Sequence, residues 1–146
     1  MYIVKVLSTA DLPLLMNVAD DVFDNPVDES FARECLADPR HHIVVALFEG
    51  IVIGFASAVH YIHPDKPTEL WINEVGVAST HQNKGVGKAI MNELLQLGRK
   101  LGCVNAWVLT DRSNEPANKL YKSAGGQVAE GDTVMYEFGL NPDMLS

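Results

Sequence analysis

Gln82-Asn83-Lys84-Gly85-Val86-Gly87 follows a β-rich run, Trp71 to Val77, and stands at the head of a strongly amphipathic helix. Two glycines at a strand-to-helix junction let the backbone come close to an anion, and the helix start adds N–H groups and the positive end of the helix dipole. Lys84 adds a cation. The segment therefore predicts a phosphate-binding loop, although a simple tight connection uses the same residues.

Two common nucleotide-binding patterns do not fit this loop. A Rossmann fingerprint needs a third glycine three residues after the second, and this chain has Ile90 there. A P-loop ends in Gly-Lys-Ser/Thr, whereas here the chain continues Gly87-Lys88-Ala89. We therefore set aside NAD and ATP as ligands.

The residues after the loop have the clearest helical pattern in the chain. Polar residues occupy the other faces, Gly102 is expected to end the helix, and the apolar stripe consists of Val86, Ile90, Leu94, Leu97 and Leu101. Asn105–Thr110 is a short apolar run of strand type. Strand, loop, helix and strand make a βαβ unit, so the two strands should be parallel.

A second informative segment runs from Asn114 to Gly125. Asn114 suits a helix N-cap, Pro116 suits the first turn, and Gly125 suits the position just past the end. A short helix is therefore expected. Its Tyr121 then points to one side, where a tyrosine taken alone is most often a packing residue.

Together the two segments resemble the GNAT superfamily of acyl-CoA-dependent N-acetyltransferases. The family's pyrophosphate loop, Q/R-x-x-G-x-G/A, is matched by Gln82, Gly85 and Gly87. The family's second signature is N-x-x-A-x-x-L-Y-x-x-x-G-F, and it is matched by Asn114, Ala117, Leu120, Tyr121 and Gly125. Only its final phenylalanine is missing, because this chain has Gly126 there. The resemblance implies a mixed α/β fold. Its central sheet should have six to seven mostly antiparallel strands with one parallel pair, and helices on both faces.

Three further stretches are similar to segments of the aminoglycoside 3-N-acetyltransferases of GNAT type. They are Met16–Phe23, Ile72–Val77 and Tyr136–Pro142. This similarity points to a small cationic amine, of aminoglycoside or polyamine type, as the acetyl acceptor. Two alternatives stay open: acetylation of a protein lysine or N-terminus, and a non-catalytic acyl-CoA-binding module.

The remaining chain gives a coarser prediction. Ser8 or Thr9 should cap a helix whose apolar stripe ends at Phe23. The other expected elements are a strand at Ile3–Leu7, a helix at Glu29–Leu36, two strands at Ile43–Phe48 and Val52–Tyr61 that form a hairpin around Glu49-Gly50, and two late strands, the last at Thr133–Phe138.

Size and charge favour one enzyme domain over residues 1–146. The net charge of -8 disfavours nucleic acid as a partner and favours cationic small molecules. Neither a membrane segment nor a secretion leader is evident, so a cytoplasmic location is expected. Cys35 and Cys103 lack metal-ligand spacing and should be free thiols, and no metal is expected. The oligomeric state stays open, with a homodimer as one possibility.

The resemblance also implies which residues contact acetyl-CoA. The strand end near Val75 and Val77 should pair with the pantetheine arm and offer an N–H to the thioester oxygen. Tyr121 is the implied general acid. Its ordinary pKa of ~10 is about 1.5 units above that of a thiol, so full proton transfer costs only about 2 kcal/mol. The implied cofactor-binding residues are Val75, Val77, Gln82, Asn83, Lys84, Gly85, Val86, Gly87, Lys88, Asn114 and Ala117.

The acceptor amine must also lose a proton, and Glu74 is the first candidate base. It would need burial to raise its pKa, or it would act through water; an exposed strand carboxylate is the alternative. His60 is a further candidate at the end of a strand. The last expectation is an acidic rim that would bind a polycation. It would consist of Asp20, Asp21 and Asp24, although these three residues equally suit a solvated helix face.

Overall fold

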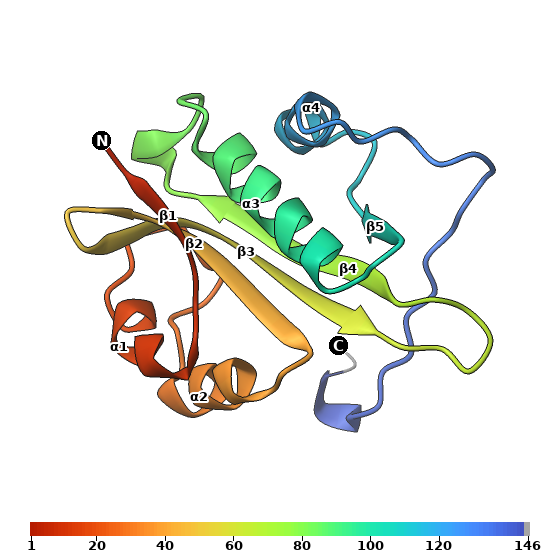
Figure 1. Cartoon of the computed structure of the whole chain (residues 1–146), viewed down its shortest axis with the longest axis horizontal. Helices are drawn as coiled ribbons and strands as arrows, with labels where there is room; N and C mark the ends of the chain where they lie inside the picture. The colour runs from red at the N-terminus through yellow and green to blue at the C-terminus, as the bar shows by residue number, and fades with distance from the viewer. Residues whose placement is uncertain (145–146) are drawn as a thin grey trace.

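The computed structural model describes residues 1–144 and contains an open sheet with helices on both faces (Figure 1). The strands lie in sequence order across the sheet, and β4 and β5 are parallel while the other pairs are antiparallel. They are β1 Ile3–Val6, β2 His41–Phe48, β3 Ile51–Tyr61, β4 Glu69–Val77 and β5 Asn105–Val108. The mixed fold and its parallel pair are therefore confirmed, with five strands in the described residues where six to seven were expected.

The hairpin between β2 and β3 forms where the sequence placed it. Glu49 and Gly50 both have positive φ, 52° and 78°, which is the geometry of a two-residue type I′ turn. That turn matches the twist of the two strands, so Val45 and Phe55 pair across the ladder and both lie in the core.

One face of the sheet is covered by α3, Val86–Lys100, and α4, Glu115–Ser123, lies beside α3 (Figure 1). Most of the predicted apolar stripe faces the sheet: Val86, Ile90 and Leu94 are almost completely buried and Leu97 packs against the same core. The last predicted member, Leu101, lies past the end of α3 and is exposed. The helix ends as expected, because Gly102 takes the left-handed conformation with φ +83°.

Helix α4 has a capping hydrogen bond at each of its two ends. At its start, the Asn114 side chain accepts a hydrogen bond from the Ala117 N–H at 3.2 Å. At its end, the Gly126 N–H donates to the Tyr121 carbonyl at 2.8 Å and Gly125 has φ +99°, a Schellman motif. A Cβ on residue 126 would lie 2.9 Å from the Tyr121 oxygen, so the glycine that replaces the family's phenylalanine permits this tight turn.

The other face is covered by short helices, and the long first helix predicted up to Phe23 is wrong. The structure has a 3₁₀ helix, η1 Thr9–Asp11, then α1 Leu12–Leu15, and later α2 Glu29–Ala37. After Leu15 the chain turns extended because it pairs with the start of β3: Ala19 donates to the Val52 carbonyl at 2.9 Å. The apolar residues of the expected stripe still reach the core, since Leu15 and Val22 are buried.

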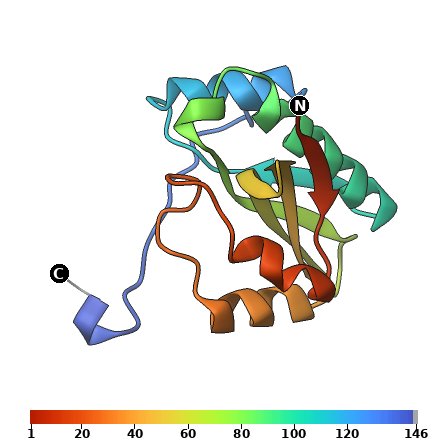
Figure 2. The same cartoon turned by 90° about the vertical axis from the view of Figure 1, so that its left-hand side faces the viewer.

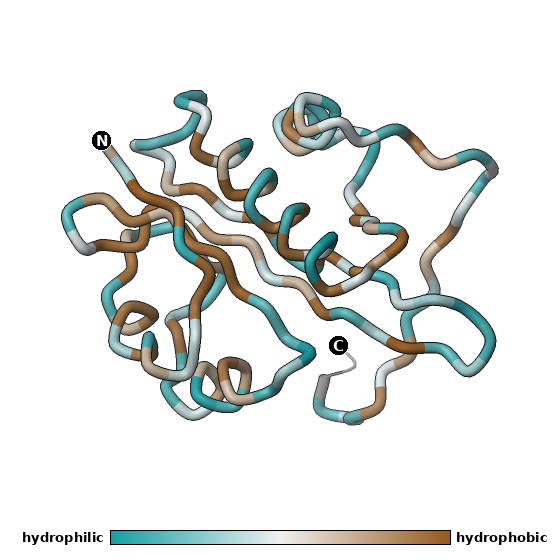
Figure 3. Tube along the Cα trace, viewed as in Figure 1, coloured by the Kyte–Doolittle hydropathy of each residue, from teal (hydrophilic) through white to brown (hydrophobic). Residues whose placement is uncertain are grey.

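The last predicted strand, Thr133–Phe138, is also not formed. Residues 127–141 have no regular structure and run away from the sheet as an extended segment, here called the C-terminal arm (Figure 2). Figure 3 colours parts of this arm as hydrophobic although they lie far from the core. A strand needs a neighbouring edge to satisfy its backbone, and in one copy of the chain the arm has none beside it.

Two smaller expectations can be compared directly. Cys35 and Cys103 are free thiols, as predicted, and burial raises the pKa of each. Among residues 1–144, none of the helices combines the length and the apolar character needed to span a bilayer.

A histidine pair lies at the end of the sheet where β3 finishes. The Nε2 atom of His42 and the Nδ1 atom of His60 are 2.7 Å apart, and the two rings stack with centroids 5.0 Å apart. Burial first, and then the neighbouring His60 and His41, lower the pKa of His42 to about 4. The fold therefore favours neutral His42.

This pair should make the protein less stable in mild acid. The unfolded chain takes up the His42 proton near pH 6.5, whereas the folded chain takes it up only near pH 4. The contribution of neutral His42 to the free energy of unfolding is therefore fully present above pH 6.5 and is lost as the pH falls from 6.5 to about 4. We expect His42→Gln to flatten the pH dependence of the free energy of unfolding between these values. Urea titrations measure this, with His81→Gln as the control, because His81 lies outside this pair and contacts Thr80. An unchanged slope in His42→Gln would contradict the assignment.

Candidate active site

A cavity of about 330 Å³ opens where β4 runs on beyond β5. The pairing of the two strands ends at Ile72 and Val108, so the last five residues of β4, Asn73–Val77, have an edge that β5 does not cover. The cavity is lined by Asp21, Val22, Asp24, Phe55, Asn73, Glu74, Val75, Gly76, Val77, Gln82 and Tyr121. Residues from both ends of the chain thus meet at this free edge.

Two features of β4 shape the cavity, and neither was predicted. Asn73 is an extra residue in the ladder, because Ile72 pairs with Ala58 while Glu74 pairs with Ser57. Such a bulge bends a strand and redirects its side chains. Gly76 lets another segment cross the strand closely, since a Cβ there would lie 2.2 Å from the carbonyl oxygen of Val22. A glycine inside a strand pattern was the available signal for that close approach.

The predicted phosphate loop has the geometry of an anion site. Gly85 takes φ +81° as the N-cap of α3, and no side chain caps that end. Ala89 is the first residue whose N–H reaches a helical acceptor, the Gly85 carbonyl at 3.0 Å, so the N–H groups of residues 86–88 have no acceptor in the described chain. A Cβ built on Gly85 would meet nothing within 4 Å, which leaves space for a ligand in front of the loop.

Three loop residues also have structural roles. The Gln82 side chain donates to the Val77 carbonyl at 3.0 Å and so ties the loop to the end of β4. Lys84 donates to the Thr80 carbonyl at 3.2 Å, within its own loop. A Cβ on Gly87 would lie 3.2 Å from Leu120, so this glycine allows α3 and α4 to pack closely. Gly85 is therefore the loop glycine that faces open space.

The cavity gathers most of the chemically reactive residues singled out in the sequence. Tyr121 is half-buried on α4, and burial raises the pKa of its phenol. Glu74 is exposed, so the burial expected of a direct base is absent; action through water and a plain exposed strand carboxylate are the two alternatives that stay open. Asp21 and Asp24 line the same cavity from the loop between α1 and α2, and Asp21 accepts a hydrogen bond from the Ser79 N–H at 3.2 Å.

Other predicted residues lie elsewhere. Asp20 is exposed beside Asp21 but does not line the cavity, and His60 belongs to the pair with His42. Their expected part in substrate binding therefore has no geometric support. Asn114 and Ala117 form the first turn of α4 outside the cavity, where they bond to each other.

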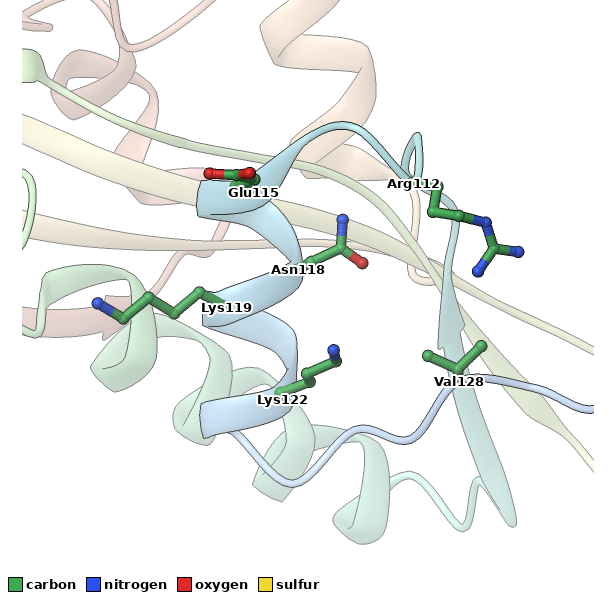
Figure 4. Close-up of a pocket in the computed structure, with 6 residues that line it drawn as sticks. All are labelled: Arg112, Glu115, Asn118, Lys119, Lys122 and Val128. Atoms are coloured by element: carbon green, nitrogen blue, oxygen red, sulfur yellow. The ribbon is translucent and has the colours of Figure 1, made fainter.

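A second hollow, of about 470 Å³, lies between α4, the loop after β5 and the start of the C-terminal arm (Figure 4). It contains none of the residues predicted for catalysis or cofactor binding. Three of its lining residues are cationic, and the full lining is Arg112, Glu115, Asn118, Lys119, Lys122 and Val128.

Comparison with known proteins agrees with this geometry. The profile of the Acetyltransferase (GNAT) family matches residues 12–125. The chain belongs to the GNAT family of acetyltransferases. The sequence-based prediction of the family and of an acetyltransferase is therefore confirmed.

Relatives of this GNAT acetyltransferase have different acceptors in their names. It is 34% identical over 118 residues to N-alpha-acetyltransferase RimI of Mycobacterium tuberculosis, covering 81% of this chain and 70% of that protein. It is 29% identical over 128 residues to streptothricin acetyltransferase of Streptomyces lavendulae, covering 88% of this chain and 65% of that protein. The family is thus shown, and the acceptor differs between relatives.

Solved structures share the fold of this GNAT acetyltransferase. An aminoglycoside acetyltransferase from an uncultured soil metagenomic sample, in complex with sisomicin, superposes with a TM-score of 0.80 at 19% identity, covering 96% of this chain and 97% of that one. Aminoglycoside N-acetyltransferase AAC(6')-Iy in complex with CoA superposes with a TM-score of 0.77 at 18% identity, covering 97% and 96%. At such identities the likeness establishes the fold alone.

Proposed function

We propose that this GNAT acetyltransferase transfers the acetyl group of acetyl-CoA to a primary amine of a small, multiply charged substrate of aminoglycoside or polyamine type. The observation that carries the proposal is the convergence of Asp21, Asp24 and Glu74 on the cavity that Tyr121 also lines. Lysine and arginine are absent from that lining. Carboxylates of one sign in a cleft attract a polycation and hold it by several charges.

The residues present fit an acetyl-CoA cosubstrate. The N–H groups at the start of α3 and the space in front of Gly85 suit a diphosphate. The free edge of β4 around Val75 and Val77 suits an extended pantetheine arm, which has amide groups that can pair with a strand. Its N–H groups would also donate to the thioester oxygen as charge develops there.

Two proton transfers then fall to residues of the cavity. The amine nitrogen bonds to the thioester carbon, the carbon–sulfur bond breaks, and the Tyr121 phenol gives its proton to the departing sulfur. Burial raises the pKa of Tyr121, so the phenol keeps this proton throughout the neutral range. The amine proton leaves through water to the Glu74 carboxylate, which lines the cavity and is exposed to solvent.

Removing the two cavity aspartates should weaken binding of multiply charged amines. We expect Asp21→Asn with Asp24→Asn to raise KM at least about 10-fold for a polyamine or aminoglycoside with little change in kcat, because the charges attract the substrate without touching the reacting atoms. Asn at position 21 can still accept the Ser79 N–H bond. Steady-state kinetics by thiol release measure both constants.

Asp20→Asn is the matched control for Asp21→Asn made alone. Each removes one charge, but Asp20 lies outside the cavity lining, so KM should change little in Asp20→Asn. Added salt should reduce the wild-type preference for polycations, because the Debye length falls from about 10 Å at 0.1 M to about 3 Å at 1 M. An equal effect of all three aspartates, or a preference for monovalent amines, would contradict a cavity built for a polycation.

A second candidate function is acetylation of a protein N-terminus. The relative RimI, 34% identical over 118 residues, is the observation that favours it. A thiol-release screen against aminoglycosides, polyamines and peptides with a free N-terminus separates the two, since the best substrate by kcat/KM decides. Absence of thiol release with every amine would instead indicate a binding module.

A further inference from the structure

Two tryptophans stack on each other on the sheet, near the candidate active site. Trp71 of β4 and Trp107 of β5 are partners in the parallel ladder, and their rings lie with centroids 5.2 Å apart and planes 11° apart. The Trp107 indole N–H donates to the Tyr61 hydroxyl at 2.8 Å, which fixes that ring. Trp71 rests on it and is nevertheless 38% exposed. This tryptophan pair, Trp71 and Trp107, therefore offers an aromatic surface that is rigid and open to solvent.

The tryptophan pair lies on the same face of the sheet as the cavity. Side chains of a regular strand alternate between the two faces, so Phe55 and Val59 of β3 point the same way. Phe55 lines the cavity, and Val59 is the ladder partner of Trp71. Glu74, which also lines the cavity, is the partner of Ser57 on that face. An acceptor bound in the cavity can therefore extend along β4 to the tryptophan pair.

The charges around the pair favour a cation. Strands β3, β4 and β5 contain no lysine or arginine, and β4 has a carboxylate on each side of Trp71, namely Glu69 and Glu74. Glu69 is the partner of Tyr61 on the same face, where its carboxylate lies 3.0 Å from the Nε2 atom of His63. The face of an indole ring attracts a cation, and nearby carboxylates add to that attraction. A positively charged nitrogen is therefore the group that suits this surface.

We propose that the tryptophan pair is a second subsite for the acceptor. Trp71 holds one ammonium group by a cation–π contact while another amine of the same molecule receives the acetyl group in the cavity. This inference rests on the proposed function and specifies its substrate. Glu74 and Trp71 are three residues apart, which is about 10 Å along a strand. The preferred acceptors are therefore amines with a second ammonium group at that separation, on a polyamine chain or on linked amino sugars.

Matched linear amines test the subsite. Diaminobutane and diaminooctane are both dications, but of the two only diaminooctane is long enough to reach from the cavity to Trp71. Octylamine has the longer chain with a single charge, so it accounts for the apolar contribution of that chain. We expect kcat/KM for diaminooctane to exceed the value for each of the other two amines about 5-fold or more. Thiol release measures these rates.

Substitution of Trp71 should reduce this selectivity. Trp71→Leu keeps an apolar side chain but removes the aromatic face, so the advantage of diaminooctane over octylamine should fall about 5-fold. Trp71→Phe keeps a smaller ring and should lose less of the advantage. Phe31→Leu is the matched control, because Phe31 is 75% exposed on α2 and does not line the cavity. Circular dichroism checks that each variant is folded, and an advantage that survives Trp71→Leu overturns the subsite.

Tryptophan fluorescence tests the subsite without turnover. The chain has two tryptophans, and both belong to the pair, so all of the tryptophan emission comes from the proposed subsite. Titration with diaminooctane should change this emission to a saturating value, and octylamine should change it less. Unchanged emission, or equal use of diaminooctane and octylamine, overturns the subsite. Absence of thiol release with every amine contradicts the proposed function instead, and the fluorescence titration then still decides whether the pair binds a dication.

Discussion

Gly85→Asp should raise the dissociation constant for CoA at least about 100-fold, by placing a carboxylate where the loop presents its N–H groups. The wild-type position has φ +81°, and a Cβ there would have nothing within 4 Å, so the new side chain would occupy the space left for the diphosphate. At an effective dielectric constant of about 20, two unit charges 4 Å apart repel by about 4 kcal/mol. Calorimetric titration with CoA measures the effect.

Gly102→Asp is the matched control for Gly85→Asp. It introduces the same side chain at nearly the same φ, +83°, again with nothing within 4 Å, but at the opposite end of α3. At the helical rise per residue, the two positions are about 25 Å apart. Both variants bear the same backbone strain, so a selective loss in Gly85→Asp reports on the anion site. Equal CoA affinity in the two variants would refute the loop's assignment.

Tyr121→Phe should lower turnover about 100-fold or more while CoA affinity changes little. The ring and its packing against the core remain, and only the proton donor is lost. Single-turnover acetylation and CoA titration separate the two quantities. Tyr61→Phe is the control, since it deletes a phenol that accepts a bond from Trp107 outside the cavity. Full turnover in Tyr121→Phe would mean that the sulfur leaves without this proton.

The parts of the fold that the sequence predicted well are those determined by nearby residues. The loop, α3 and its end at Gly102 lie in one continuous segment, so spacing and turn chemistry were sufficient. The long first helix failed because its apolar spacing also suits a chain that turns extended and bonds to Val52. The strand Thr133–Phe138 failed because strand pairing depends on an edge that sequence does not show.

Some residues of the candidate site could likewise be identified from local sequence motifs, and others could not. Tyr121 and Gly85 belong to local motifs and were found directly. The aspartates could not be ranked, because Asp21, at a turn with φ 57°, lines the cavity while its neighbour Asp20 does not. The exposure of Glu74 depends on neighbours that are remote in sequence, so its protonation route could not be chosen beforehand.

The contact between Gly76 and the carbonyl of Val22 restricts how this enzyme can be redesigned. The loop with Asp21 and Asp24 crosses β4 at the one residue of that strand that lacks a side chain, and loop and strand line the same cavity. New acceptor pockets can therefore be built by altering residues 20–25, provided that position 76 remains glycine. An alanine there would overlap the Val22 carbonyl oxygen, push the loop outward and disturb acceptor and donor selectivity together.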